Sequence, residues 1–194
     1  MNIMDVIRLR RSIKPESMKA DPVARDLLDQ LFEAANWAPS HGRTEPWRFV
    51  VFTDDARLDL ARVLASAEVG SSPVSETDPT YLKLRQKMTN APVVIAIICA
   101  PSPNPKIEPH EELASVAMAV QNMHLCARAL GLGGFWSSGK KAFHPAVASF
   151  LEVAPPAHCL GFFYVGWPAI PWPKGERGSV THKVTWRNRT ELSI

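Results

Sequence analysis

A cluster of cations near the start of the chain has the residue types of an anion-binding site. Residues 8 to 17, RLRRSIKPES, hold three arginines, a serine and a lysine within seven positions. Two guanidinium groups beside a hydroxyl match a phosphate, because each guanidinium donates parallel hydrogen bonds. The same arginines also fit the last turn of a short amphipathic helix over residues 4–9, where they bond free carbonyls and complement the helix dipole. This segment alone leaves both interpretations open.

A second candidate segment is rich in glycine. Four of the chain's ten glycines fall within residues 131–139, GLGGFWSSG. Glycine is dense where a backbone turns sharply or comes close to a ligand. Gly134, Gly139 and Lys140 match the start of a P-loop, but Lys141 stands where that motif needs a serine or threonine for magnesium. The glycines also follow a helical segment and not a strand, so we do not expect a nucleoside triphosphatase.

A polar loop, PSHGRTEP at residues 39–46, lies between two rigid segments and contains His41. Loops held in this way often carry binding residues, although a solvated polar loop explains the composition equally well. His124 lies instead in an apolar helical segment, which favours a hydrogen-bonded core histidine. The His-Glu pair that could begin H-E-x-x-H has Ala114 in place of the second histidine. We therefore expect no metal site.

Hydrophobic periodicity predicts the elements that position these segments. We expect helices over residues 22–38, 55–67, 81–88, 111–130 and 144–151, and strands over residues 47–53, 93–100, 133–138 and 160–168. Asp21 is a candidate N-cap for the first of these helices, with Pro22 at its first position. The irregular alternation of helices and strands predicts an α+β or mixed α/β layer fold.

Two segments extend this prediction. The helix at residues 111–130 is apolar nearly all round, so we expect it to be buried on more than one side, within a domain or against a partner. Residues from Ala169 onward contain little core material and predict an extended C-terminal arm that lies on another surface. The 194 residues, of which 46% are hydrophobic, fit a single domain over residues 1–194.

Composition argues against several classes of partner. The net charge of +3 is small and evenly spread, which fits an anionic small ligand and gives no support for nucleic acid. The apolar run at residues 93–100 is too short to cross a bilayer, and charges from Asp5 onward argue against a secretory signal. The three cysteines lie in separate apolar runs, as reduced core thiols do in cytoplasmic proteins. We expect a cytoplasmic protein without a membrane partner.

Three separated motifs resemble those of the nitroreductase family, above all of its short bacterial members. They are RRSIK near the N-terminus, A-P followed by P-W-x-F at residues 38–49, and a long helix ending in G-L-G-G-x-W. Their order and spacing cover nearly the whole chain. The resemblance implies an α+β homodimer with a mixed sheet flanked by helices, and one FMN at each of two subunit-interface sites. It also implies reduction of nitroaromatics or quinones with NADH or NADPH as electron donor.

The resemblance further implies roles for the cation cluster. Arg10, Arg11 and Ser12 fall where the family contacts the phosphate and ribityl chain of FMN. Lys14 falls where a basic residue often meets the N1/O2 edge of the flavin. A cation at that edge stabilises the negative charge of the reduced ring. No catalytic side chain is implied, because the hydride chemistry belongs to the flavin.

Three more segments are implied to reach the cofactor. One is the polar loop, which in dimers of the family contacts the flavin of the partner subunit. The second is the strand after the long helix, which touches the isoalloxazine ring or the phosphate, and the third is a phosphate contact from the tail. The residues concerned are Ser40, His41, Arg43, Trp136, Ser137, Ser138 and either Arg187 or Arg189.

The chain also departs from the family pattern. Arg43 and Glu45 stand where many relatives have Asn and Gln, and Ser137 stands where close relatives can carry Arg. The arginine at 43 could replace the one absent at 137. The departures leave the choice of substrate open, together with two alternatives. One is a relative with another flavin reaction, such as oxidative dehalogenation or flavin breakdown, and the other is a non-enzymatic flavin-binding or storage module.

Overall fold

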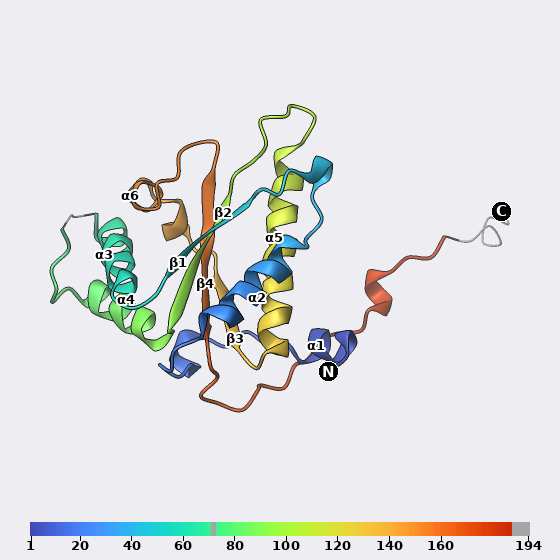
Figure 1. The fold of residues 1–194 in the computed structure, drawn as a ribbon, viewed down its shortest axis with the longest axis horizontal. Helices are drawn as coiled ribbons and strands as arrows, with labels where there is room; N and C mark the ends of the chain where they lie inside the picture. The colour runs from blue at the N-terminus through green and yellow to red at the C-terminus, as the bar shows by residue number, and fades with distance from the viewer. Residues whose placement is uncertain (71–72, 188–194) are drawn as a thin grey trace.

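An antiparallel sheet of four strands, in the order β1-β2-β4-β3, lies at the centre of the fold (Figure 1). The computed structural model describes residues 1–70 and 73–187 of the chain. The strands are β1 Trp47–Phe52, β2 Val93–Cys99, β3 Gly133–Ser137 and β4 His158–Gly166. At the outer edge of β3, Ser12 adds an isolated parallel bridge to Gly134. The predicted α+β class is confirmed.

Helices cover both faces of this sheet. They are α1 Ile3–Leu9, α2 Arg25–Asn36, α3 Ala56–Val69, α4 Pro79–Asn90, α5 Pro109–Ala129 and α6 Pro145–Phe150. Figure 1 shows α2 and α5 on one side of the strands and α3, α4 and α6 on the other. All seven residues of β2 are buried, because its alternate side chains pack into the two helical layers. The sheet is therefore the middle of three layers, and both of its faces contribute to the core.

Local sequence explains where most helices begin. Pro109 starts α5, and Glu108 and Glu111 form a reciprocal capping box there. Asp78 caps α4 by accepting a hydrogen bond from a backbone N–H. The predicted start of α2 at residue 22 is wrong by three residues. The indole of Trp167 donates to the carbonyl oxygen of Pro22 at 3.2 Å, and this tertiary bond accompanies a segment that becomes helical only at Arg25.

The long helix α5 is buried along one face in a single chain. Val116, Val120 and Met123 are almost fully buried against the sheet and α2. Leu113 and Met118 keep 39% and 40% of their surface exposed. The second buried side expected from the sequence is therefore open to solvent when the chain is alone.

After β4 the described chain forms an extended arm. From Ala169 to Arg187 it contains only one short 3-10 turn, Thr181–Lys183, and its residues are mostly exposed. Figure 1 shows the arm passing α1 and then running away from the rest of the molecule. This agrees with the arm expected from the sequence. Among the helices of the described residues, none has the length and apolar character that crossing a membrane requires.

Candidate functional site

Arg10 and Arg11 end α1 in different environments. Arg11 Nη1 donates hydrogen bonds to the carbonyl oxygens of Arg8 at 2.8 Å and Arg10 at 2.6 Å, so Arg11 bonds the free carbonyls of the helix end. Arg10 instead turns toward α5, where its Nη1 lies 3.4 Å from Nε2 of His124. The exposed Ser12 follows directly. The helix-end interpretation thus applies to Arg11, while Arg10 and Ser12 remain available to a ligand.

His124 holds Arg10 as a neutral hydrogen-bond acceptor. Its imidazole is buried and packs edge-on against Phe163, with ring centroids 5.2 Å apart. Burial, and next the charge of Arg10, lower the pKa of His124 from 6.5 to about 4. The ring is therefore uncharged at neutral pH, and Nε2 can accept from the guanidinium group. This agrees with the hydrogen-bonded core histidine predicted from the sequence.

Two arginines that are distant in sequence join the cluster. Burial lowers the pKa of Arg10 most, and the next contribution comes from the charge of Arg177 in the arm. Arg128, at the end of α5, places its guanidinium carbon 3.8 Å from the centre of the Trp172 ring. Sequence reasoning missed both residues because no local motif marks them. Only the folded chain brings the end of α5 and the arm beside the N-terminal segment.

This cation cluster lacks counter-charges within the described residues. There, no carboxylate forms an ion pair with any of its five arginines, which are Arg8, Arg10, Arg11, Arg128 and Arg177. The Nε atoms of Arg11 and Arg128 are buried and have no hydrogen-bond partner in this part of the chain. A cavity of about 330 Å³ beside the cluster is lined by Ile7, Arg8, Arg11, Gly175 and Arg177. An anion in this cavity would offset the mutual repulsion of the cations and satisfy donors that are otherwise costly to bury.

Glycines hold the RRS segment against β3. The backbone N–H of Ile13 donates to the carbonyl oxygen of Gly134 at 3.0 Å. A Cβ atom on Gly133 would lie 2.8 Å from Cβ of Ile13, and one on Gly134 would lie 2.5 Å from Cζ of Phe163. Both distances are too short for carbon atoms, so only glycine permits this packing. The glycine-rich motif and the cation cluster therefore form one unit.

The predicted contacts Trp136, Ser137 and Ser138 lie at the end of β3. Trp136 packs toward the α2 and α5 layer, and within the described residues its Nε1 is buried without a partner. Ser137 is half-buried and Ser138 is exposed. Their backbone passes directly over Gly161 of β4, since a Cβ atom there would lie 2.3 Å from the carbonyl oxygen of Ser137. Gly161 is therefore a positioning residue that the sequence analysis missed.

The loop at residues 40–46 is fixed to the start of α5. His41 Nδ1 lies 3.0 Å from Oε2 of Glu111, and this hydrogen bond is the main cause of the lowered pKa of Glu111. Thr44 Oγ1 donates to Oε2 of the buried Glu112 at 2.8 Å. The other carboxylate oxygen of Glu112 accepts a hydrogen bond from a backbone N–H of the loop before α5. The loop is thus held at two points, His41 and Thr44, by the first turn of α5.

Three residues of this loop have left-handed backbones. The φ angles of Gly42, Arg43 and Glu45 are 60°, 56° and 46°. For a residue other than glycine, such a backbone conformation costs about 1–3 kcal/mol. It persists only where surrounding contacts enforce it. Ser40 contributes one such contact, because its Oγ accepts from the backbone N–H of Glu45 at 3.1 Å. The loop therefore presents His41 and Arg43, both exposed, in a defined shape.

A single chain does not bring the loop and the cation cluster together. His41 contacts Glu111 in the first turn of α5, whereas Arg10 contacts His124 near its end. At 1.5 Å per residue, these two positions lie roughly 20 Å apart along the helix. The two groups of predicted site residues therefore belong to opposite ends of α5.

The remaining predicted residues are exposed. Lys14 Nζ lies 3.9 Å from Oε1 of Glu16, with both side chains in solvent. Arg187 lies in the exposed arm. Arg189 lies outside the described residues. Neither Lys14 nor Arg187 has a buried environment that would fix its role within one chain.

Comparison with known proteins decides the family. A sequence profile described as the Nitroreductase family matches residues 7–167, which is most of the chain. The chain belongs to the nitroreductase family. Membership supports an oxidoreductase activity and confirms the resemblance seen in the three sequence motifs.

Individual relatives of this nitroreductase-family protein are moderately similar. A provisionally named NAD(P)H nitroreductase, YdjA of Escherichia coli K12, is 29% identical over 168 residues, which cover 86% of this chain and 90% of that protein. The 5,6-dimethylbenzimidazole synthase of Rhodospirillum rubrum is 28% identical over 193 residues, covering 93% and 86%.

Solved structures confirm the fold. A nitroreductase-like family protein of Bacillus cereus superposes with a TM-score of 0.83 at 24% identity, covering 96% of each chain. A provisionally named nitroreductase of Desulfovibrio desulfuricans, solved in complex with FMN, gives a TM-score of 0.72 at 25% identity and covers 97% of this chain and 98% of that one.

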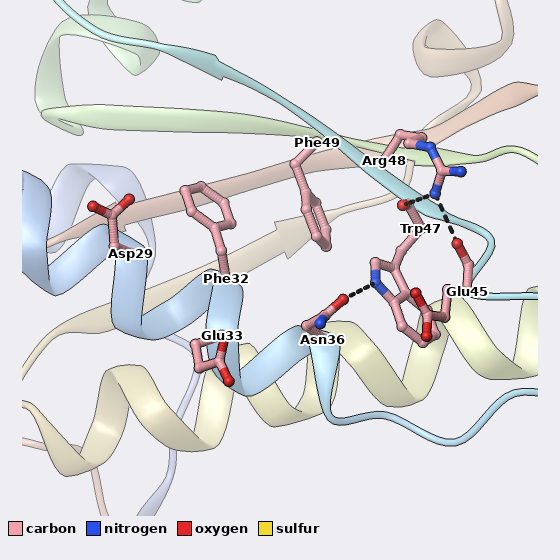
Figure 2. Close-up of a pocket in the computed structure, with 8 residues that line it drawn as sticks. All are labelled: Asp29, Phe32, Glu33, Asn36, Glu45, Trp47, Arg48 and Phe49. Atoms are coloured by element: carbon pink, nitrogen blue, oxygen red, sulfur yellow. Dashed lines mark hydrogen bonds between the residues drawn. The ribbon is translucent and has the colours of Figure 1, made fainter. Parts of the chain in front are cut away.

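A hollow between α2 and β1 explains the surroundings of Glu45 in this nitroreductase-family protein (Figure 2). Arg48 Nη1 donates to the carbonyl oxygens of Glu45 and Trp47, both at 2.7 Å. Trp47 Nε1 donates to Oδ1 of Asn36 at 3.3 Å. The hollow has a volume of about 360 Å³ and three acidic residues in its lining, which are Asp29, Glu33 and Glu45. It shares no residue with the cation cluster, so Glu45 lines a separate, acidic surface.

Replacement of Gly161 by alanine is expected to destabilise the protein. The added methyl group would meet the carbonyl oxygen of Ser137 at 2.3 Å, and the φ angle of 121° disfavours any side chain. Strain and overpacking together predict a loss of roughly 2–5 kcal/mol of unfolding free energy, or about 5–15 °C in melting temperature. The matched control is Gly178→Ala, whose methyl group meets nothing within 4 Å. Equal melting temperatures for the two variants would contradict the positioning role of Gly161.

Proposed function

We propose that this protein is an FMN-dependent oxidoreductase that uses NADH or NADPH to reduce nitroaromatic or quinone-like acceptors. The observation that carries the proposal is the cation cluster without counter-charges, which is built from the RRS motif and held against the glycines of β3. Membership of the nitroreductase family supports the reaction class. The FMN complex of the Desulfovibrio desulfuricans relative supports the cofactor.

The residues present fit FMN. Arg10, Arg11, Ser12 and the arm residue Arg177 would hold the phosphate. Arg11 and Arg177 line the cavity, Arg11 has a buried Nε without a partner in the described residues, and Arg10 and Ser12 flank Arg11 in sequence. Trp136, with a buried Nε1 that lacks a partner in the described chain, and the following Ser137 and Ser138 would contact the ring or ribityl chain. Bound FMN supplies the exchange of a hydride with the nicotinamide donor and the transfer of electrons to the acceptor. Lys14 would stabilise negative charge at the N1/O2 edge.

We further propose that residues 1–194 form one FMN-binding domain that acts as a homodimer with shared sites. The polar loop and the cation cluster lie at opposite ends of α5, so a second chain is needed to bring His41 and Arg43 beside Arg10. Apolar side chains that are exposed in one chain would be covered by the partner, and these are Ile3, Met4, Ile7, Leu113, Met118 and Trp186. The arm that leaves the molecule beside α1 would lie on the partner subunit (Figure 1).

A second candidate function is a flavin reaction of another type. The 5,6-dimethylbenzimidazole synthase of Rhodospirillum rubrum aligns with 93% of this chain, so full-length similarity does not separate the two activities. Release of 5,6-dimethylbenzimidazole by the FMN-loaded protein, without turnover of an added acceptor, would favour this candidate. A protein that binds FMN and shows neither activity would favour the storage module.

Steady-state kinetics test the proposed reaction directly. With donor and acceptor using one pocket in turn, anaerobic oxidation of NADH or NADPH should require an acceptor and give parallel lines in double-reciprocal plots. The measurement follows the absorbance of the reduced nicotinamide at several fixed concentrations of a quinone or a nitroaromatic. Apoprotein without added FMN is the control and should be inactive. Intersecting lines would show a ternary complex and contradict the single shared pocket.

A further inference from the structure

A lysine-rich cavity adjoins the end of β3. It has a volume of about 230 Å³ and touches both Ser137 and Gly139. Leu84, Phe162 and Tyr164 give it an apolar and aromatic floor. Its cations are Lys87, Lys140 and Lys141. The cavity therefore joins an aromatic surface, positive charge and the segment to which the proposed flavin site belongs.

A second cavity adjoins this one along α4. It has a volume of about 330 Å³, shares Leu84, Lys87 and Lys141 with the first, and adds Lys83 and Glu68. Glu68 forms an ion pair with Lys141 and so neutralises one of the four lysines. Within the described residues, Lys83, Lys87 and Lys140 form no ion pair. Together, the two adjoining cavities keep an excess of positive charge.

Lys87 is the cation placed deepest in this cavity. Its Nζ lies 4.6 Å from the centre of the Tyr164 ring and 5.7 Å from that of Phe135. Burial lowers the pKa of Lys87 most, Lys141 and Lys83 lower it further, and Glu16 opposes them. Burial also raises the pKa of Tyr164, so the phenol beneath Lys87 stays neutral. The ammonium group is thus partly desolvated and held over aromatic rings, and within the described residues no carboxylate pairs with it.

We propose that this cavity is an acceptor subsite that selects aromatic substrates carrying an acidic group, with Lys87 binding the carboxylate and Phe162 and Tyr164 contacting the ring. The inference rests on the proposed function, because it places the acceptor next to Ser137 and Gly139. Small-molecule pockets of about 300–1,000 Å³ hold drug-sized ligands, so the two adjoining cavities suit an acceptor of one or two rings. The departures from the family pattern at Arg43 and Glu45 lie in a separate loop, whereas the third, Ser137, lines this cavity. The subsite therefore acts on substrate choice independently of that loop.

The test compares two acceptors of nearly equal shape in the holoenzyme. Lys87→Met keeps the length of the side chain and removes its charge. For 4-nitrobenzoate, kcat/KM should fall roughly ten- to hundredfold, mostly through KM, because a hydrogen bond to a charged group is lost. For neutral 4-nitrobenzamide, kcat/KM should change less than about twofold, since it has no carboxylate to bind. Lys106→Met, a lysine in a separate exposed loop, is the matched control and should change neither value.

Binding of benzoate gives a readout that needs no turnover. Calorimetric titration should show that benzoate binds the FMN-loaded protein more tightly than benzamide, and that Lys87→Met removes the difference. Lys87→Arg should restore most of the preference, because it retains the charge. If Lys87→Met fails to fold, Lys140→Met removes another positive charge from the same cavity at an exposed position. It should reduce the preference for 4-nitrobenzoate.

The other possible outcomes show whether the acceptor subsite or the proposed function is wrong. Equal losses for the acid and the amide, or no loss for either, would overturn the subsite. A loss confined to NADPH relative to NADH would mean that the lysines bind the 2′-phosphate of the donor, and this also overturns the acceptor assignment. If no acceptor is reduced while benzoate still binds through Lys87, the proposed function fails and the anion subsite stands.

Discussion

A double variant, Arg10→Ala with Ser12→Ala, is expected to fold normally and to purify almost free of FMN. Within the described residues, the side chain of Arg10 forms one hydrogen bond, at 3.4 Å to His124, and Ser12 is exposed. Their removal therefore costs the fold little. Arg11 is excluded from the variant because its guanidinium bonds two carbonyl oxygens of the helix end.

The expected effect on FMN affinity is large. A hydrogen bond to a charged group contributes about 1.5–3 kcal/mol, so the loss of two such bonds amounts to about 3–6 kcal/mol. This corresponds to a rise in Kd of roughly 150- to 20,000-fold. The measurement is the ratio of flavin absorbance to protein after purification, followed by titration of the apoprotein with FMN. Flavin released by heating is identified as FMN or FAD by chromatography.

Two controls separate cofactor binding from stability. Arg25→Ala removes an exposed arginine that pairs with Asp29 on α2, away from the cluster, and should leave the FMN content unchanged. Arg11→Ala should lower the melting temperature as well as the FMN affinity, since it removes helix-end hydrogen bonds. A double variant with full FMN content, or wild-type protein that releases FAD, would refute the assignment of the phosphate site.

The fold was predictable where local sequence and burial agree. The strand at residues 93–99 could be recognised because a run of β-branched residues suits a strand buried on both faces. The long helix predicted over residues 111–130 could be recognised from its length and its apolar residues, although it begins two residues earlier, at Pro109. The start of α2 could not, because it accompanies a hydrogen bond from Trp167, which lies 145 residues away from Pro22 in sequence. A contact of that range leaves no local pattern.

The residues of the candidate site were likewise predictable from the sequence only in part. Arg10, Arg11 and Ser12 are adjacent in sequence, so their residue types alone suggested an anion site. Arg128 and Arg177 reach it only through α5 and the arm, and Lys87 reaches its cavity only through the packing of α4 on the sheet. The different roles of Arg10 and Arg11 were also hidden from the sequence. They depend on which guanidinium turns toward His124 and which turns back to α1.

Co-expression of two different variants is expected to restore one complete FMN site per dimer. One chain carries Arg10→Ala with Ser12→Ala, and the other carries His41→Ala with Arg43→Ala. If sites are shared, the mixed dimer has one site with all lesions and one site with none. The structural reason is that the loop and the cluster lie at opposite ends of α5, roughly 20 Å apart within one chain. Each variant alone should bind FMN weakly at both of its sites.

Two affinity tags isolate the mixed dimer, and its FMN content is measured by absorbance. The expected value is about half that of a doubly tagged wild-type dimer, as one intact site of two requires. The mirror control places all four substitutions on one chain and pairs it with a wild-type chain. Shared sites then each contain one set of lesions, so the control dimer should be nearly free of FMN.

The two dimers contain the same substitutions in equal number, so stability and net charge are matched and only the arrangement differs. Sites built within one chain would reverse the result, with half occupancy in the mirror control and almost none in the mixed dimer. Stable interfaces of the obligate kind commonly bury about 2,000 Å² or more, and the exposed apolar residues of α1 and α5 provide a surface for such an interface. Folding and association should therefore be coupled, and the melting temperature should rise with protein concentration. A protein that stays monomeric at micromolar concentration with FMN fully bound would refute the shared site and the placement of the His41 loop beside the partner's flavin.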